Sequence, residues 1–81
     1  MKHIHQQVLK LIQQNDWDAA HRLVQDYSDS LSCQIHGYLH RIEGDLSNAR
    51  YWYQRAGLHM PDNSRDEELK RLFKRVMNMT N

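Results

Sequence analysis

The sequence predicts an all-α protein in which amphipathic helices are joined by short turns. Apolar residues recur three and four positions apart along most of the 81-residue chain, which is the spacing of an α-helix with one buried face. Three Gly and one Pro are too few for the many turns of a β-sandwich or barrel. A chain of this length forms one small domain with a modest core. We therefore expect a single helical domain, residues 1–81, folded as an antiparallel stack of five helices.

The first two helices are expected to form a hairpin over residues 2–27. Ile4 and Val8 begin the apolar stripe of the first helix, and Leu11 and Ile12 continue it. Asp16 can cap the second helix, because its carboxylate accepts a hydrogen bond from an unpaired backbone N–H. The apolar positions of that second helix are Trp17, Ala20, Leu23, Val24 and Tyr27.

A second hairpin is expected over residues 31–57, after a polar break at Ser28, Asp29 and Ser30. Gly44 can adopt the left-handed conformation that ends its first helix. Either Asp45 or Ser47 then caps the next helix, and Gly57 closes it. The apolar positions of this hairpin are Leu31, Ile35, Leu39, Ile42, Leu46, Ala49, Trp52, Tyr53 and Ala56.

The last helix is predicted over residues 64–79, where it caps the stack. Ser64 and Glu67 form a capping box, in which each side chain bonds the backbone N–H of the other residue. Acidic residues lie near the start of this helix and basic residues toward its end, an order that suits the helix dipole. Its apolar stripe consists of Leu69, Leu72, Phe73, Val76 and Met77.

The chain also contains an internal repeat, in which residues 15–20 align with residues 44–49 at a distance of 29 residues. Residues 33–61 resemble a tetratricopeptide repeat, and the first hairpin matches that family at fewer positions. The segment 36–57 is also similar to small microbial helical proteins without an assigned activity. The residues that carry the tetratricopeptide resemblance are Gly37, Gly44, Asp45, Ala49, Tyr53, Ala56 and Pro61.

This resemblance implies a protein–protein interaction module or small adaptor subunit with no catalytic activity of its own. The first helix of each hairpin would line a groove that holds a segment of an unidentified protein or peptide partner, with Tyr38 and Arg41 fixing its register. In the alternative interpretation, neighbouring helices simply cover the apolar members of this face. Because a short stack leaves apolar edges, a second copy of the chain could also cover them in a homodimer. The expected partner-binding residues are Gln34, Tyr38, Arg41, Ile42, His5 and Leu9.

A pair of histidines suggests a different function, a metal-dependent or acid–base enzyme. His36 and His40 lie one helical turn apart on the same face, and Glu43 follows three residues later. Zinc accepts such ligands, but a catalytic zinc needs three protein ligands, and the sequence does not indicate a third strong one nearby. The interpretation we favour is two half-buried histidines bonded to Asp or to backbone groups across the hairpin. We therefore expect neither a bound metal nor another cofactor.

A second alternative is a nucleic-acid accessory protein that uses the basic face of the last helix. Lys70, Arg71, Lys74 and Arg75 form that face, but the net charge is only +1 and the same helix begins with three acids. A solvated surface is therefore the favoured interpretation, and nucleic acid is not an expected partner. No apolar run is long enough for a signal peptide or membrane span. The single cysteine, Cys33, fits a reducing compartment, so we expect a cytoplasmic protein.

Overall fold

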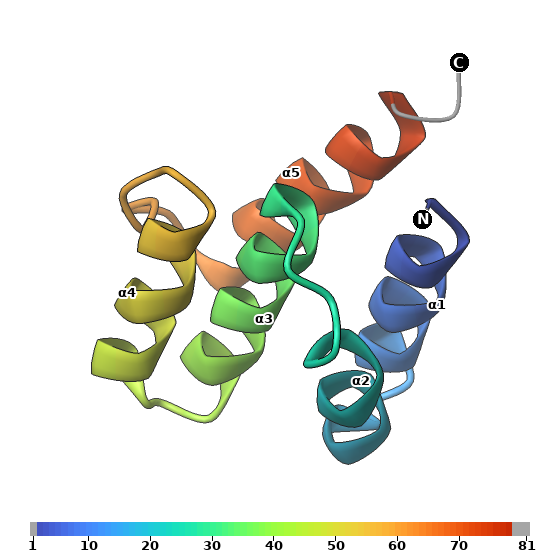
Figure 1. Ribbon diagram of the computed structural model, residues 1–81. Helices are drawn as coiled ribbons and strands as arrows, with labels where there is room; N and C mark the ends of the chain where they lie inside the picture. The colour runs from blue at the N-terminus through green and yellow to red at the C-terminus, as the bar shows by residue number, and fades with distance from the viewer. Residues whose placement is uncertain (1, 79–81) are drawn as a thin grey trace.

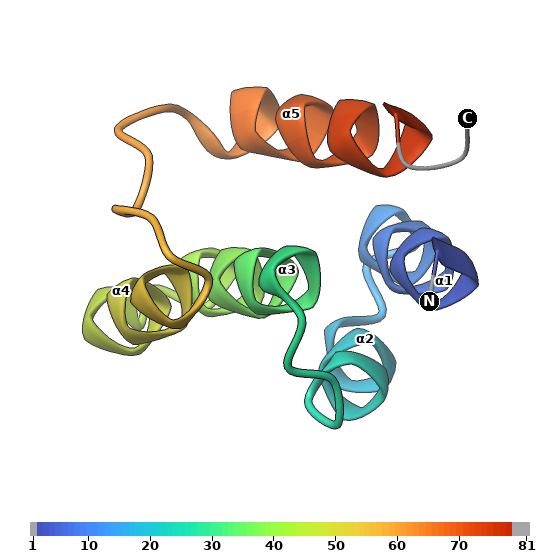
Figure 2. The ribbon, with the colours of Figure 1, turned by 45° about the horizontal axis from the view of Figure 1, so that its top comes forward.

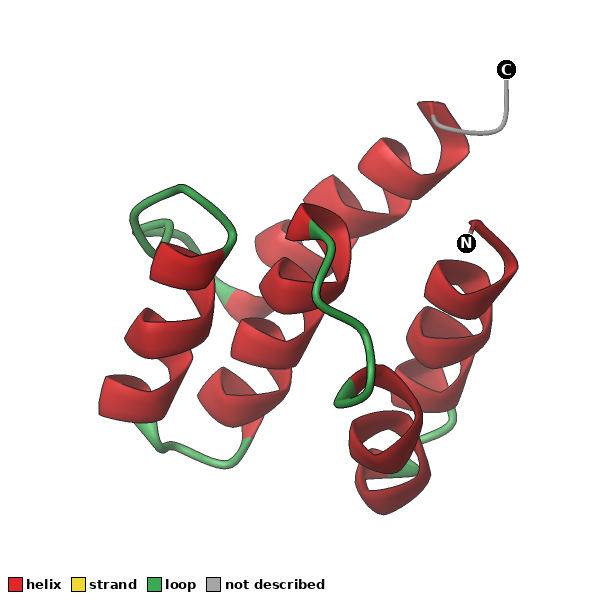
Figure 3. Ribbon diagram, viewed as in Figure 1, coloured by secondary structure: helices red, strands yellow, loops and turns green. Residues whose placement is uncertain are grey.

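The computed structural model describes residues 2–78 and confirms the all-α class (Figure 1). Over this range the chain consists of five helices joined by loops, without a strand (Figure 3). None of these helices combines the length and apolar character needed to cross a membrane. Met79, at the end of the predicted last helix, lies outside the described residues. The helices are α1 (Lys2–Gln13), α2 (Trp17–Val24), α3 (Ser30–Ile42), α4 (Leu46–Arg55) and α5 (Arg65–Asn78).

The helices form two hairpins and a fifth helix that lies across both of them. α1 packs against α2, α3 packs against α4, and α2 joins the hairpins by packing against α3. In Figure 2, α5 runs over α3 and α1, on the side away from α4 and α2. The first helix of each hairpin is therefore enclosed between its own second helix and α5.

The 29-residue sequence repeat is a repeat of local backbone structure. Asn15 and Gly44 both adopt the left-handed conformation, with φ of 60° and 85°. Asp16 and Asp45, which follow them, have closely similar backbone angles (φ −99°, ψ 73° and φ −90°, ψ 79°). Each carboxylate accepts the N–H three residues further on at 3.3 Å. The two hairpin turns thus end one helix and cap the next in the same way.

Gly37, one of the residues that carry the tetratricopeptide resemblance, allows α3 and α4 to approach closely. A Cβ atom at this position would lie 2.8 Å from the Tyr53 ring and 3.1 Å from the carbonyl oxygen of Ala49. Both distances are too short for ordinary packing, and Tyr53 is itself fully buried. Only glycine therefore fits between these two helices without moving them.

The helix ends follow the predicted capping groups, with one shortened helix. In the capping box, the Ser64 N–H donates to Glu67 at 2.9 Å and the Glu67 N–H donates to Ser64 at 3.1 Å. α2 ends at Val24, although the apolar pattern predicts a helix that reaches Tyr27. The Tyr27 N–H instead bonds the Val24 carbonyl at 3.0 Å, which turns the chain toward α3.

The main core lies where α1, α2, α3 and α5 meet. Leu9, Ile35, Leu39 and Leu72 are completely buried in it. α3 is the central helix, because every residue from Leu31 to His40 is buried. This burial includes polar side chains, and their partners distinguish the possible functional sites.

Candidate functional site

The face expected to bind a partner is covered by the chain itself. Gln34 is completely buried and Tyr38 is 4% exposed, because α5 lies over this side of α3. The Tyr38 hydroxyl donates to the Arg65 carbonyl at 3.0 Å, and Arg41 donates to the Asn63 side chain at 2.9 Å. The two anchors of the predicted groove therefore bind the end of the α4–α5 loop and the start of α5.

The other expected partner-binding residues also lie at internal contacts. His5 and Leu9 are completely buried on α1, and Ile42 is half-buried and packs against the core. The alternative in which neighbouring helices cover this face matches their positions. A role for the six residues in partner binding stays a prediction, and it requires α5 to move away.

A buried carboxylate at the centre of this covered face joins α5 to the second hairpin. Glu68 is completely buried and accepts two hydrogen bonds from Arg71, each of 2.7 Å. It also accepts the Tyr53 hydroxyl at 2.8 Å and the Asn63 amide at 3.0 Å. Arg71 reaches on to the Gln34 side-chain oxygen at 2.9 Å. We call these five residues the Glu68 network.

The Glu68 network is electrostatically satisfied. Burial opposes ionisation of Glu68, but the hydrogen bonds from Arg71 and from two neutral side chains outweigh it and lower the carboxyl pKa. Burial, together with the neighbouring Glu68 charge, raises the pKa of the Tyr53 hydroxyl, so this group remains a donor. A charge with this many partners stabilises packing and leaves little capacity for an external ligand.

The network also changes the predicted basic face of α5. Arg71 bonds Glu68 and Gln34 and is half-buried, so it faces the interior of the protein. Lys70 and Lys74 remain exposed beside a groove, and Arg75 is exposed as well. The expected four-residue basic surface therefore loses one of its members to an internal ion pair.

On the opposite side of α3, three imidazoles converge. His36 and His40 on α3 meet His21 on α2, and one ligand nitrogen from each ring lies within 4.8 Å of the others. The Nε2 atoms of His21 and His36 are 3.1 Å apart. His36 and His40 are 3% and 6% exposed, whereas His21 is half-buried. We call His21, His36 and His40 the histidine cluster.

Two tryptophans enclose the histidine cluster. Trp17 stacks on His21 with ring centroids 4.8 Å apart, and Trp52 stacks on His36 with centroids 3.8 Å apart. The Trp17 indole N–H also donates to the Leu39 carbonyl at 2.7 Å, which fixes the first ring in place. The cluster is therefore held from both ends by flat apolar surfaces.

The hydrogen bonds in this cluster differ from those predicted. His40 Nδ1 bonds the carboxylate of Glu43, only three residues further along the chain, at 2.6 Å, instead of an Asp or a backbone group across the hairpin. His36 instead approaches another histidine, and within residues 2–78 its Nδ1 atom has no hydrogen-bond partner although it is buried. Burial, followed by the neighbouring His21 and His40, lowers the pKa of His36 to about 3. His36 is therefore a neutral imidazole at physiological pH.

Sequence reasoning missed His21 as the third member of this cluster. His21 is 15 residues before His36 and lies in a different hairpin, so no local spacing indicates their contact. The spacing between His21 and Trp17 gives a partial signal. His21 comes four residues after Trp17 and therefore lies on the same face of α2, the face that packs against α3.

A second histidine contact has the residue types of a serine hydrolase but a different arrangement. His5 Nε2 lies 2.8 Å from Asp29 and 3.0 Å from the Ser32 hydroxyl, so one nitrogen faces both groups. The Ser32 hydroxyl donates to Asp29 at 2.6 Å, and Asp29 also caps α3 by accepting the Ser32 N–H at 3.1 Å. In a catalytic triad, the acid and the serine bond opposite nitrogens of the ring. This group therefore fastens α1 to the start of α3.

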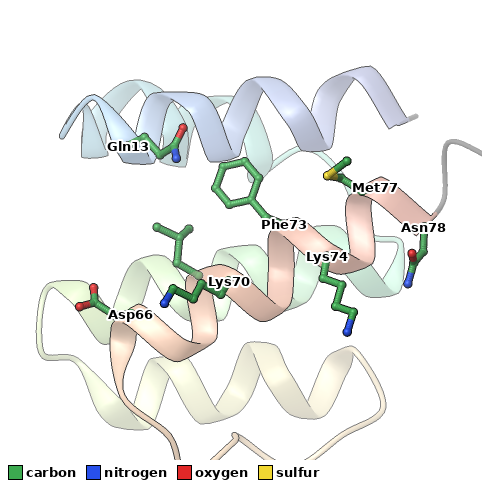
Figure 4. Close-up of a pocket in the computed structure, with 8 residues that line it drawn as sticks. Gln13, Asp66, Lys70, Phe73, Lys74, Met77 and Asn78 are labelled. Carbon is green, nitrogen blue, oxygen red and sulfur yellow. The ribbon is translucent and has the colours of Figure 1, made fainter.

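A groove runs along the outer surface between α1 and α5 (Figure 4). A hollow of about 660 Å³ adjoins another of about 470 Å³, and both contain Gln13, Phe73 and Met77. In Figure 4, Phe73 and Met77 point from α5 toward α1. Met77 is 64% exposed, the largest value among the exposed large apolar side chains of the described residues. The α1–α5 groove, defined by the residues of these two hollows, includes Gln6, Gln7, Lys10, Gln13, Asp66, Leu69, Lys70, Phe73, Lys74, Val76, Met77 and Asn78.

Comparison with known proteins gives no family for this chain: no family model, curated protein or solved structure matches it.

Proposed function

We propose that the protein is a protein–protein interaction module with no catalytic activity of its own, and that the α1–α5 groove is its contact surface. The observation that supports this assignment most directly is the exposed apolar floor of the groove. Leu69 and Phe73 are half-buried against the core, and Met77 continues the same stripe one turn further along α5. An apolar stripe at helical spacing is the surface on which the apolar face of another helix packs.

The charges at the groove edge favour an acidic amphipathic segment of another protein as the occupant. Lys10, Lys70 and Lys74 line the two hollows, whereas Asp66 is the one acid that lines them among the described residues. Glutamates and aspartates beside the apolar residues of a partner helix would pair with these lysines and steer its approach. A second copy of this chain would bring the same excess of lysines, so the grooves of two copies would repel each other.

Two sequence features support the same class of function. The resemblance of residues 33–61 to a tetratricopeptide repeat favours a role in protein recognition. In such an assembly α5 acts as the solubilising cap and also provides one wall of the contact surface. The single cysteine, Cys33, is buried, and it supports the expectation of a cytoplasmic protein.

A designed peptide tests this proposal. The probe is a synthetic helix with leucines on one face and glutamates elsewhere, titrated into the isotope-labelled protein while the backbone amide signals are recorded. We expect the shifted signals to belong to α1 and α5. Exchange of the glutamates for lysines should weaken binding about tenfold or more, because the peptide would then repel the lysines of the groove.

Two matched variants show whether the groove itself binds the peptide. Met77→Ser should weaken binding about tenfold, whereas Tyr51→Ser should leave it unchanged. Tyr51 is a suitable control because it is also exposed, at 51%, but lies on α4. Equal binding of the acidic and basic peptides, or signals shifted mainly outside α1 and α5, would contradict the proposal. A dimeric mass by sedimentation that Met77→Ser converts to a monomer would assign the groove to self-association instead.

A further inference from the structure

We propose that His21, His36 and His40 form a binding site for a divalent transition-metal ion of the zinc class. This proposal is independent of the α1–α5 groove, because the three histidines lie between α2 and α3, on the side of α3 away from α5. It depends on the distances between the ring nitrogens and on the carboxylate partner of His40.

The distances between the ring nitrogens are close to those that a metal ion requires. Zinc lies about 2.05 Å from each histidine nitrogen, so two ligands of a tetrahedral ion are about 3.3 Å apart. The Nε2 atoms of His21 and His36 are already 3.1 Å apart. His40 completes a set in which no two ligand atoms are more than 4.8 Å apart, so the three nitrogens can share one ion once they move closer together.

Glu43 holds the His40 ring in the orientation that a metal ligand needs. Its carboxylate lies 2.6 Å from Nδ1, so Nδ1 carries the proton and Nε2 keeps its lone pair. Histidine ligands of metals commonly have such a carboxylate behind them, because it fixes the tautomer and makes the ring more basic. The sequence suggested His36, His40 and Glu43 as the possible ligands. In the structure Glu43 instead supports a ligand, and His21 takes the third position.

In the metal-free protein, one proton is shared between the facing Nε2 atoms of His21 and His36. When His21 and His36 are both neutral, the 3.1 Å contact between their Nε2 atoms requires one nitrogen to carry a proton and the other to accept it. The site does not depend on the buried Nδ1 atom of His36, which has no partner in the described part of the chain and would still have none with an ion at Nε2.

The ligand set selects the class of metal. Three imidazoles suit zinc, cobalt, nickel and copper, whereas calcium and magnesium require oxygen ligands. His21 is half-buried and lies at the outer side of the cluster, so an ion can enter from solvent past α2. Three protein ligands leave a fourth position for water or another small ligand.

Cobalt and zinc titrations test the site in the full chain, produced without a histidine tag and freed of metal with a chelator. We expect one ion per chain, a visible absorption band typical of four-coordinate Co²⁺, and displacement of that band by Zn²⁺. Co²⁺ should also quench tryptophan fluorescence, because Trp17 and Trp52 stack on two of the ligands. Retention of less than one equivalent of either ion by the folded protein would overturn the proposal.

Four variants assign the ion to these residues. His21→Gln and His36→Gln each remove a ligand and should abolish the cobalt band. Glu43→Gln should weaken binding roughly 10- to 100-fold, because it loosens the His40 ring without removing a ligand. His59→Gln is the control, since His59 is exposed in the α4–α5 loop.

Circular dichroism shows whether each variant retains its helices. If His36→Gln does not fold, the half-buried His21 and the exposed Glu43 still decide the question. Full binding in the folded His21→Gln protein, unchanged affinity in the folded Glu43→Gln protein, or an equal loss in His59→Gln would place the ion elsewhere and reject this site.

Discussion

On the side of α3 that faces α5, the buried Glu68 carboxylate accepts four hydrogen bonds from three side chains. On the side that faces α2, three imidazoles form fewer hydrogen bonds with the described residues than their nitrogens allow. Both groups are polar clusters within an otherwise apolar stack of helices. The Glu68 network uses its hydrogen bonds to fasten α5 to the second hairpin. The histidine cluster brings one ligand nitrogen from each of three rings within 4.8 Å of the others, and two of these rings face each other at 3.1 Å.

This difference suggests that the completeness of hydrogen bonding distinguishes a buried polar cluster that stabilises the fold from one that can bind a ligand. A fully bonded group contributes to stability, and its removal leaves its partners unpaired. A group whose hydrogen bonds are incomplete contributes less to stability, and such groups are expected at functional sites. The comparison predicts that removing Glu68 costs much more stability than removing a histidine of the cluster.

The largest effect is expected from Glu68→Ala. Loss of the carboxylate leaves the Arg71 guanidinium and the buried Tyr53 hydroxyl without their acceptor. We expect the free energy of unfolding to fall by about 3 kcal/mol or more, measured by urea denaturation. Asp62→Asn, at an exposed position in the preceding loop, is the control and should remain within about 0.5 kcal/mol of the natural protein. A loss below about 1 kcal/mol for Glu68→Ala would show that the network is not structural.

The two clusters should respond to acid in different pH ranges. His36 faces His21, His40 and Arg55, and its pKa in the folded protein is about 3. In the unfolded chain its pKa is 6.5, so the unfolded chain binds this proton at a higher pH than the folded chain does. Stability present above pH 6.5 is therefore lost as the pH falls, by up to about 1.4 kcal/mol per pH unit. The contribution of Glu68, whose pKa is lowered from 4.5, is lost only below that value.

Urea denaturation of the metal-free protein between neutral pH and about pH 5 measures this slope. His36→Leu should reduce the slope, and Glu68→Gln should leave it unchanged over this range. An equal slope in the natural protein and in His36→Leu would contradict the assignment of the acid response to the histidine cluster.

A smaller loss is expected from Tyr38→Phe, on the α5 side of α3. This change removes the hydrogen bond from the Tyr38 hydroxyl to the Arg65 carbonyl and keeps the buried ring. We expect a loss of about 1 kcal/mol in the free energy of unfolding, measured by urea denaturation. Tyr51→Phe, on the exposed face of α4, should change it by less than about 0.5 kcal/mol. Equal effects of the two changes would show that the Tyr38 contact with α5 adds little stability.

The smallest effect is expected from His36→Leu in the metal-free protein. The substitution removes the unpaired Nδ1 atom and the contact with His21, but it also loses the stacking of His36 on Trp52. These changes oppose each other, so thermal and urea denaturation should place the variant within about 1 kcal/mol of the natural protein. A loss as large as that of Glu68→Ala would mean that both clusters are structural, and the contrast between the two sides of α3 would disappear.

Local sequence signals were enough to predict the helices and most of their ends. The turn at Asn15 and Asp16 and the turn at Gly44 and Asp45 have the predicted caps, because left-handed residues and capping carboxylates act within a few positions. The close approach of α3 and α4 at Gly37 fits the place of this glycine in the tetratricopeptide resemblance. The end of α2 was not predictable, since an apolar residue at position 27 can pack against the core from a turn as well as from a helix.

The composition and order of the side chains by themselves determined the helical class, the repeated hairpins and the histidine pair one turn apart on α3. Only the tertiary structure decided that α5 covers the inner face of α3, that Glu68 rather than an external partner binds Arg71, and that His21 joins His36 and His40. The physical reason is the range of the interactions. Helix periodicity and capping involve residues within one or two turns, whereas these contacts depend on how separate helices pack against one another.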